Sequence, residues 1–449
     1  MKKKILSLAM CLTMVASLFV ACGDKEDSKG DGGHKATSSG QVLNIYCWNE
    51  EFKSRLTDHY PGYKEVSGTE GKIGDVTVIW NITPSDDNAY QNNLDEKLLA
   101  QKDAADDDKV DLFLVEADYA IKYVDTDYTI SVKDLGITDE DVANQYQYTK
   151  DVVTDSDGNL KGVSWQGCPG VLIYRRDIAK EVLGSDDPAE VQKAVKDWET
   201  FQATAATMAD KGYMMTASVN DTYRVFSNNV TSSWVKDGKI NMDANIKEWI
   251  EMSKEMYDAG QTTAYDLWGT EWSEGFMPEG KAFCYFGPAW FVDFSMKADT
   301  EGSVAANGGW AATEGPQGFY WGGTWICAAT GTDNADLIKD IMLKLTCDET
   351  IMTDIVKDDN DFVNNKPAMD AMAADTTYSS KVLGGMNPLS MYCAGVETID
   401  LKYITKYDQT CNEALQAAMK NYFTGEATYD EAMELFEKTV KEKHPELAK

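Results

Sequence analysis

Short apolar segments alternate with an amphipathic segment in the first part of the chain, which predicts strands separated by a helix. Three apolar segments predict strands: residues 42–48, 76–80 and 110–115. Between the last two, Ser85 or Asp86 is expected to cap a helix that reaches about residue 101. Tyr90, Leu94 and Leu98 would share the apolar face of that helix. This order implies a right-handed crossover and an α/β lobe built on a parallel sheet.

Helical patterns dominate later parts of the chain. Five segments have apolar residues at helical spacing: 188–211, 245–259, 334–345, 410–423 and 429–441. Residues 165–170 interrupt the earlier alternation before an apolar strand at 171–174, so a second lobe is expected to begin near Trp165. The acidic runs 103–108 and 358–361 are expected to be solvated helix ends.

An aromatic segment at residues 276–329 is the densest feature of the sequence. Residues 282–286 and 324–329 predict short strands, and two Gly-Pro pairs break the chain between them. Four of the 12 tryptophans fall here: Trp290, Trp310, Trp321 and Trp325. Large rings are most often core, yet rings at turn-flanked strand ends can also meet a ligand. Both interpretations remain open from the sequence.

The charge of the chain limits its partners. The formal net charge is −33 at pH 7. Such a surface repels nucleic acid, anionic lipid headgroups and phosphorylated polyanions. A neutral or cationic ligand is therefore favoured.

The N-terminus resembles a bacterial lipoprotein signal. Lys2, Lys3 and Lys4 precede an apolar segment that is too short to span a membrane comfortably, and small Ala21 precedes Cys22. Residues 1–21 are expected to be the signal peptide and Cys22 to be lipidated. Residues 22–41, rich in Gly, Ser and charge, would be a flexible tether. The predicted location is the extracytoplasmic face of the cell membrane, held by the lipid alone.

Catalytic and metal motifs are mostly excluded. His34, His59 and His444 are the only histidines, which argues against a Ser-His-Asp triad and a zinc site. Residues 275–281 resemble a phosphate-binding loop, but Ala282 stands where that motif needs Ser or Thr. Residues 155–159 predict a hairpin turn rather than a calcium loop, because Val153 falls on the first ligand position. We expect no cofactor, no metal and no enzyme activity.

Cysteines give little sign of a disulfide framework. Seven follow Cys22, scattered and mostly among apolar neighbours: Cys47, Cys168, Cys284, Cys327, Cys347, Cys393 and Cys411. Buried free thiols are expected, with one bridge left open.

Several segments together resemble the extracellular solute-binding proteins of ABC importers, sugar-binding family 1, the group that contains maltose-binding protein. They are residues 43–52, 88–97, 110–124, 164–179, 280–290, 322–329 and 336–342. The resemblance runs from about residue 42 to about 440. It implies an α/β, two-lobed, periplasmic-binding-protein-like clamshell with hinge crossovers. The lobes implied are residues 42–164 with 320–364, and 165–319 with 365–449.

The resemblance also implies contacts with a ligand held in the cleft. Strand-end positions of the family fall on Trp48, Asn49, Glu50, Glu116 and Asp118, and the Gly-Pro-x-Trp position that stacks on sugar falls on Trp290. Looser matches fall on Tyr223 and Tyr407. Trp165, Trp321 and Trp325 complete the predicted ligand-binding set, with Trp325 the one most expected to be core.

The function predicted is capture of a carbohydrate, with an oligosaccharide favoured, for import by an ABC transporter. The expected partners are the ligand and the permease subunits, and the protein is expected to be a monomer. A polyamine or other cation is the alternative ligand, since rings with carboxylates also bind ammonium groups. A secreted glycoside hydrolase is the alternative from another class.

Overall fold

Two β-sheets organise the computed structural model, which describes residues 36–448. The first sheet has the order β2-β3-β4-β1-β5-β14-β6. Its strands are β1 (Val42–Cys47), β2 (Tyr63–Ser67), β3 (Glu70–Ile73), β4 (Val76–Ile82), β5 (Leu112–Glu116), β6 (Gly162–Ser164) and β14 (Thr324–Ala328). The predicted parallel arrangement is confirmed, because β1 pairs in parallel with both β4 and β5. β14 runs antiparallel to β5 and β6.

The helices of the first lobe are α1 (Glu51–His59), α2 (Ala89–Ala100), α3 (Ala120–Val124), α4 (Gln147–Asp151), α11 (Ala335–Cys347) and α12 (Glu349–Asp359). Tyr90, Leu94 and Leu98 of α2 are buried, as the helical spacing predicts. The predicted cap is wrong. Residues 86–88 form a short 3₁₀ turn, and α2 begins after Asn88, which has φ +60° and makes no side-chain capping bond.

The second sheet has the order β12-β7-β11-β8, with β13 also paired to β7. Its strands are β7 (Pro169–Arg175), β8 (Met214–Thr216), β11 (Ala282–Gly287), β12 (Trp310–Thr313) and β13 (Phe319–Tyr320); β9 (Val235–Lys236) and β10 (Lys239–Ile240) form a separate pair. Every residue of β7 is buried. Leu172 and Tyr174 pack in one apolar cluster and Val171 and Ile173 in the other, as expected when side chains alternate along a strand.

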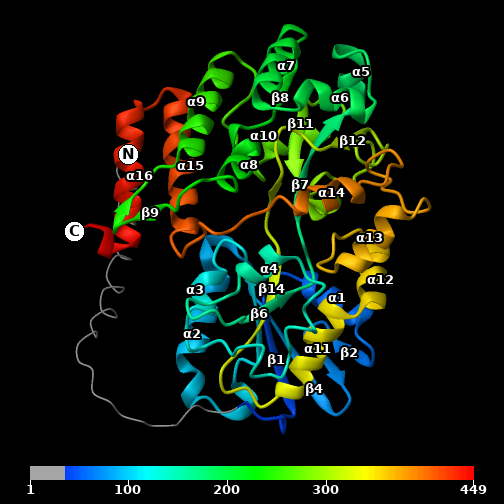
Figure 1. Ribbon diagram of the computed structural model, residues 1–449, viewed down its shortest axis with the longest axis vertical. Coiled ribbons are helices and arrows are strands. Elements are labelled where there is room, and N and C mark those ends of the chain that lie inside the picture. Colours follow the sequence, from blue (N-terminus) through cyan, green and yellow to red (C-terminus); the bar gives the residue numbers. More distant parts are fainter. Residues whose placement is uncertain (1–35, 449) are drawn as a thin grey trace, which may run out of the picture. The chain divides into compact units, whose positions relative to one another are not determined.

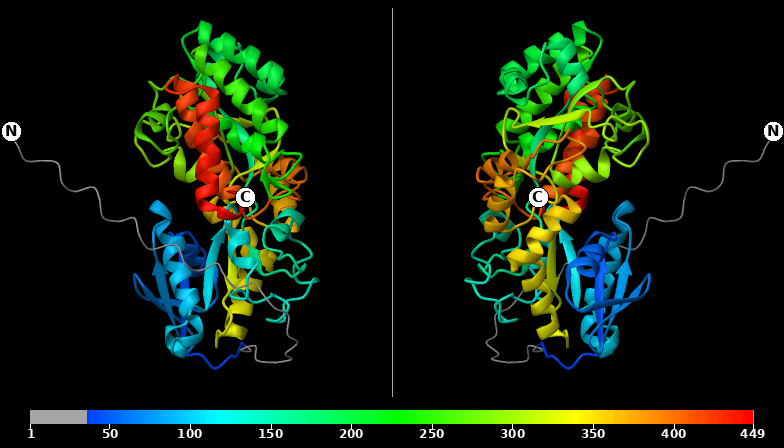
Figure 2. Two further views of the ribbon diagram at one scale, coloured as in Figure 1. Left: turned by 90° about the vertical axis from the view of Figure 1, so that its left-hand side faces the viewer. Right: turned by 90° about the vertical axis from the view of Figure 1, so that its right-hand side faces the viewer.

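The remaining helices are α5 (Arg176–Val182), α6 (Pro188–Val195), α7 (Trp198–Asp210), α8 (Tyr223–Ser227), α9 (Ala244–Asp258), α10 (Thr270–Ser273), α13 (Lys366–Ala374), α14 (Leu389–Val396), α15 (Asp408–Thr424) and α16 (Tyr429–Lys443). The single helix predicted over 188–211 is two helices. Asp197 ends the first and caps the second by accepting a hydrogen bond from the Thr200 amide. Figures 1 and 2 show α15 and α16 side by side.

The chain passes between the sheets at short segments. Residues 165–168 lead from β6 in the first sheet to β7 in the second, and residues 321–323 lead back from β13 to β14. Gln166 also forms an isolated antiparallel bridge with Val363. The predicted two-lobed α/β architecture is confirmed (Figure 1). The exact lobe boundaries stay a prediction.

The start of the described chain corrects the predicted tether. The Thr37 amide donates to the Thr332 carbonyl at 3.1 Å, and the Gly40 amide to the Asp333 carbonyl at 2.8 Å. Residues 37–40 therefore belong to the folded body. The predicted signal peptide and Cys22 lie outside the described residues. Within residues 36–448, no helix combines the length and apolar character that a membrane crossing needs.

Three smaller predictions can be compared with the structure. The hairpin turn at 155–159 is confirmed by the antiparallel bridge between Thr154 and Leu160. The seven cysteines after Cys22 are free thiols, five of them buried. The prediction that residues 358–361 are solvated is wrong for Asp361, which is 2% exposed.

Candidate functional site

A carboxylate pair after β5 meets an arginine of the second lobe. Arg224 of α8 binds Asp118 through both terminal guanidinium nitrogens, Nη1 to Oδ1 at 2.6 Å and Nη2 to Oδ2. The Asp118 amide donates to Glu116 Oε2 at 2.8 Å, which turns the Glu116 carboxylate back toward the strand end. The carboxyl ends of strands are where open α/β sheets bind ligands. The first lobe thus presents two carboxylates to the second.

Burial dominates the electrostatics of this pair. It raises the pKa of Glu116 well above its usual range; the Asp118 carboxylate raises that pKa further and Arg224 lowers it. At Asp408, burial raises the pKa and hydrogen bonds from Thr405 lower it; burial prevails, and the pKa rises to about 7. The site therefore contains carboxyl groups that can hold a proton near neutral pH and donate or accept a hydrogen bond.

Three tryptophans form an aromatic wall beside the carboxylates: Trp268, Trp290 and Trp321. The ring centroids of Trp290 and Trp321 lie 5.5 Å apart, and Trp268 lies 5.6 Å from Trp321. Trp290 Nε1 donates to the Trp321 carbonyl at 3.1 Å, which fixes the ring. The guanidinium of Arg224 lies 5.9 Å from the Trp321 ring. The wall is thus continuous with the ion pair.

Gly322 is the point at which the rings and the carboxylates meet. A Cβ atom at this position would lie 3.6 Å from the Trp290 ring and 3.8 Å from Glu116 Oε1. Its φ of +72° is also a conformation that favours glycine. An apolar ring and a carboxylate therefore lie close to one point beside the backbone, at the crossing back to β14.

A small cavity lies beside the ion pair. Its volume is about 30 Å³, which leaves room for about two water molecules. It is lined by residues of both lobes, among them Asp118, Arg224, Tyr320, Asp408 and Asn412. A ligand as large as a sugar could enter only if these side chains or the two lobes moved apart.

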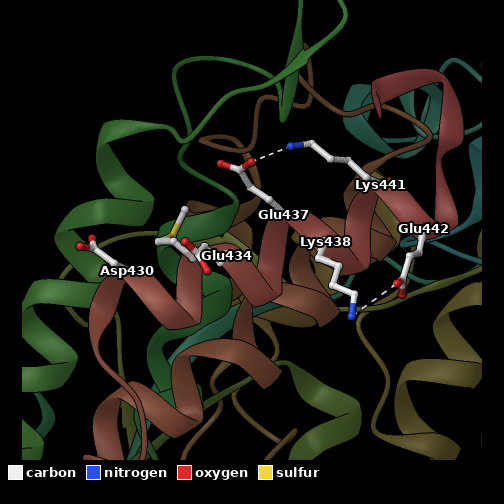
Figure 3. A pocket seen from close by; sticks show the side chains of 7 residues that line it. Asp430, Glu434, Glu437, Lys438, Lys441 and Glu442 are labelled. Carbon is white, nitrogen blue, oxygen red and sulfur yellow. Dashed lines mark hydrogen bonds and ion pairs between the residues drawn. The ribbon is translucent and has the colours of Figure 1, made fainter. Parts of the chain in front are cut away.

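A wider hollow on α16 is not a comparable site. All seven residues that line it come from that one helix, so it is an open helix surface. Figure 3 shows its side chains paired along the helix, Lys441 with Glu437 at 2.7 Å and Lys438 with Glu442 at 3.8 Å. These are ordinary exposed ion pairs.

The structure brings four of the predicted site residues together: Glu116, Asp118, Trp290 and Trp321. Trp48 lies nearby but rests its ring against Tyr90 at 5.5 Å and Tyr119 at 6.4 Å. Asn49 accepts a hydrogen bond from the Glu51 amide at the start of α1. The Glu50 side chain is 77% exposed and makes a 3.8 Å ion pair with Lys53.

The other predicted rings are placed in packing roles. Trp165 is fully buried, stacks on Phe52 and donates to Asp361. Trp325 is 1% exposed and donates to the Thr149 carbonyl. In this conformation neither ring has a free face for a ligand.

Both predicted tyrosines are held within the second lobe. Tyr223 is 1% exposed and donates to Asn412 at 2.6 Å. Tyr407 precedes α15 and packs against His444 at a ring distance of 4.8 Å. Tyr223 therefore supports the cavity wall from behind, because Asn412 lines that cavity.

Sequence reasoning missed Arg224 and Trp268. The sequence has only four arginines, and each forms an ion pair with a carboxylate: Arg55, Arg175, Arg176 and Arg224. The small number of arginines could have marked Arg224 as a candidate site residue, because the arginine side chain suits fixed, two-point pairing with carboxylates. Nothing in the sequence around Trp268, apart from its being a tryptophan, indicated a place in the site.

Comparisons with known proteins agree with this architecture. Residues 70–383 match the family model described as bacterial extracellular solute-binding protein. No curated protein matched the chain. A crystal structure of an extracellular solute-binding protein of family 1 has a TM-score of 0.72 and 17% identity, covering 89% of this chain and 99% of that one.

Two further structures are similar in fold. The ABC transporter associated binding protein of B. animalis subsp. lactis Bl-04, solved with beta-1,6-galactobiose, has a TM-score of 0.67 and 14% identity, covering 91% of this chain and 98% of that one. The sugar-binding protein MalE of Xanthomonas citri has a TM-score of 0.65 and 15% identity, covering 91% and 97%. These neighbours are binding proteins rather than enzymes. The predicted periplasmic-binding-protein fold is confirmed.

Proposed function

The chain belongs to the bacterial extracellular solute-binding proteins, and we propose that it captures a carbohydrate, with an oligosaccharide favoured, for import by an ABC transporter. The observation that carries this proposal is the closeness of the Trp290 ring and the Glu116 carboxylate at Gly322, where both lie within 3.8 Å of the position that a Cβ would occupy. Sugars have apolar CH faces and outward hydroxyls, so they suit a site that pairs rings with carboxylates. The neighbours solved with sugars support the same class of ligand.

A cationic ligand such as a polyamine is the second candidate. Asp118, Glu116 and Asp408 surround a single guanidinium, Arg224, which already pairs with Asp118. Ammonium groups bind carboxylates and aromatic faces, and the net charge of −33 would attract them. A glycoside hydrolase remains the less favoured alternative.

Calorimetry with oligosaccharides and polyamines separates the candidates. Trp290→Ala should weaken carbohydrate binding by roughly 1–3 kcal/mol and leave the fold intact, because the ring is only partly buried. Trp198→Ala is the matched control: this half-buried ring stacks on Phe226 at 4.3 Å, outside the aromatic wall, and its loss should not change affinity. Tight polyamine binding without any heat from sugars would overturn the choice of ligand, and cleaved products on chromatography would reveal a hydrolase.

Chain length should affect affinity. The aromatic wall offers more than one ring, so a tri- or tetrasaccharide should bind more tightly than its monosaccharide, by about 1 kcal/mol for each added stacked unit. Native mass spectrometry with mixed plant-polysaccharide digests would test this directly. Retention of monosaccharides alone would contradict a site with several subsites.

The proposed lobes are residues 42–164 with 320–364 and residues 165–319 with 365–449. The passages at 165–168 and 321–323 and the bridge between Gln166 and Val363 support hinges close to these boundaries, with Tyr320 itself still paired to Pro169 of β7 in the second sheet. We expect the lobes to rotate there and to close on the ligand. Small-angle scattering should then show a more compact particle with ligand, and unchanged dimensions at saturation would contradict closure.

We also propose that lipid on Cys22 holds the protein on the extracytoplasmic face of the membrane, where it meets permease subunits as a monomer. Replacement of Cys22 by serine should release the protein into the soluble fraction. Mass spectrometry of the N-terminal peptide would check the lipid, and an unmodified Cys22 in membrane-bound protein would contradict the proposal.

A further inference from the structure

Trp268 stands out as an exposed ring in a constrained loop. It lies between α9 and α10, its exposed fraction is 54%, and its φ is +70°. Bulky residues rarely adopt positive φ, and such backbone persists only where the surroundings hold it, which is common at functional sites. A loop with no other role would be expected to have glycine or asparagine here.

The loop around Trp268 is held at several points. The Gly269 amide donates to the Asp266 carbonyl at 3.0 Å and closes a tight turn. Lys420 of α15 binds both carboxylate oxygens of Asp266, at 2.7 and 2.8 Å. Ser218 Oγ donates to the Tyr265 carbonyl at 2.8 Å. The ring is thus presented from a fixed backbone rather than from a loose loop.

Trp268 extends the aromatic wall outward from the carboxylates. Its ring centroid lies 5.2 Å from Trp272, 5.6 Å from Trp321 and 6.2 Å from Trp290. The exposed fraction of the rings rises from Trp272, which is buried, through Trp290 and Trp321, which are half-buried, to Trp268, which is open to solvent. A ligand held at Trp290 and long enough to leave the cleft would therefore meet Trp268 next.

We propose that Trp268 stacks on an outer sugar unit of a bound oligosaccharide, adjacent to the unit held at Trp290 and Trp321. The inference rests on the proposed carbohydrate-binding function and adds to it a subsite outside the cleft. Rigid aromatic side chains supply contact area at a small loss of conformational freedom, so a fixed, exposed ring suits this role. Trp268 then selects for chain length rather than for the chemistry of the inner unit.

The test compares short and long ligands on one variant. Calorimetry would use β-1,6-galacto-oligosaccharides and malto-oligosaccharides of two and four units. Trp268→Ala should weaken binding of the four-unit ligand about five- to tenfold and change that of the two-unit ligand less than about twofold. Tyr265→Ala, in the same loop and 40% exposed, is the matched control and should change neither.

The outcomes separate this inference from the proposed function. If wild type binds neither series nor any other oligosaccharide tested by calorimetry, the proposed function fails and the inference fails with it. If wild type binds but Trp268→Ala behaves like wild type, or weakens both lengths equally, only the outer subsite is refuted.

A second variant excludes a purely structural role. Trp268→Gly should keep or raise the midpoint of thermal unfolding, since glycine adopts positive φ freely, and should lose affinity as Trp268→Ala does. A lower midpoint with unchanged affinity for the four-unit ligand would make Trp268 a packing residue and overturn the proposal.

Discussion

Replacing Arg55 with methionine should remove the cation that three carboxylates share inside the first lobe; among the described residues, Asp359 keeps a second basic partner, His59, at 2.8 Å. The Arg55 guanidinium lies 2.7 Å from Asp359, 3.4 Å from Asp361 and 3.9 Å from Glu51. The Arg55 side chain is only 4% exposed and that of Asp361 only 2%. Methionine keeps the apolar stem of arginine and removes the charge, so the variant isolates the electrostatic contribution.

The magnitude follows from the burial of this cluster. Removing one partner of a buried ion pair costs about 3–5 kcal/mol, because the remaining charge stays desolvated and unpaired. Arg55 Nε has no hydrogen-bond partner among the described residues. One guanidinium nitrogen therefore adds no bond that the substitution would remove. We therefore expect a loss near the lower end, about 3 kcal/mol at slightly alkaline pH.

This loss should depend on pH. Burial raises the pKa of Glu51 to about 7 and raises that of Asp361, while Arg55 lowers both. A carboxyl whose pKa is higher in the folded protein contributes its full stability below the unfolded pKa, and that contribution is lost as pH rises through the folded pKa. Without Arg55 both values rise further, so the variant should be weakest above about pH 7 and closest to wild type near pH 5.

Urea denaturation near pH 5 and at slightly alkaline pH measures the difference in the free energy of unfolding between the variant and wild type. A double variant, Arg55→Met with Asp361→Asn, should recover part of the loss, because it removes one of the unpaired charges. The reasoning would be refuted by an equal loss at both pH values, or by a double variant that is less stable than the single one.

Three further predictions concern stability and are measured by urea or thermal unfolding. Trp325→Ala should cost about 3–5 kcal/mol by opening a cavity and leaving the Thr149 carbonyl unpaired, and carbohydrate affinity should not fall in the folded fraction. Gly170→Ala should cost about 1–3 kcal/mol, because the new Cβ would overlap the buried Phe319 ring; a neutral result would mean that the ring moves freely. Asp197→Ala should cost about 1 kcal/mol by removing the cap of α7, and no loss would contradict that role.

Strands were predictable because their signal is local. The apolar segments that became β1, β4, β5, β11 and β14 needed no knowledge of their neighbours. The break at Asp197 was less visible, because the residues on both sides of it favour helix. Only the capping side chain reveals that a new helix begins.

The candidate site was predictable only in part, because burial depends on distant residues. Asp361 lies in an acidic run that predicts exposure, yet its main partner, Arg55, is 306 positions away in the sequence. Trp165 begins a break in the strand pattern and Trp290 follows another, yet Phe52 covers the Trp165 ring, whereas the Trp290 ring stays half-buried. Neither outcome can be derived from spacing along the chain.

The free thiols of the two sheets make local opening measurable. Cys47 of β1 and Cys284 of β11 are both 0% exposed, and burial raises the pKa of each thiol, to about 12 for Cys47. An alkylating reagent can reach either sulfur only when its own sheet opens, because the thiolate is both hidden and scarce. Mass spectrometry of the two peptides after brief alkylation in low urea would therefore give a separate opening rate for each lobe. The protein thus carries a native reporter in each half, with no engineered label.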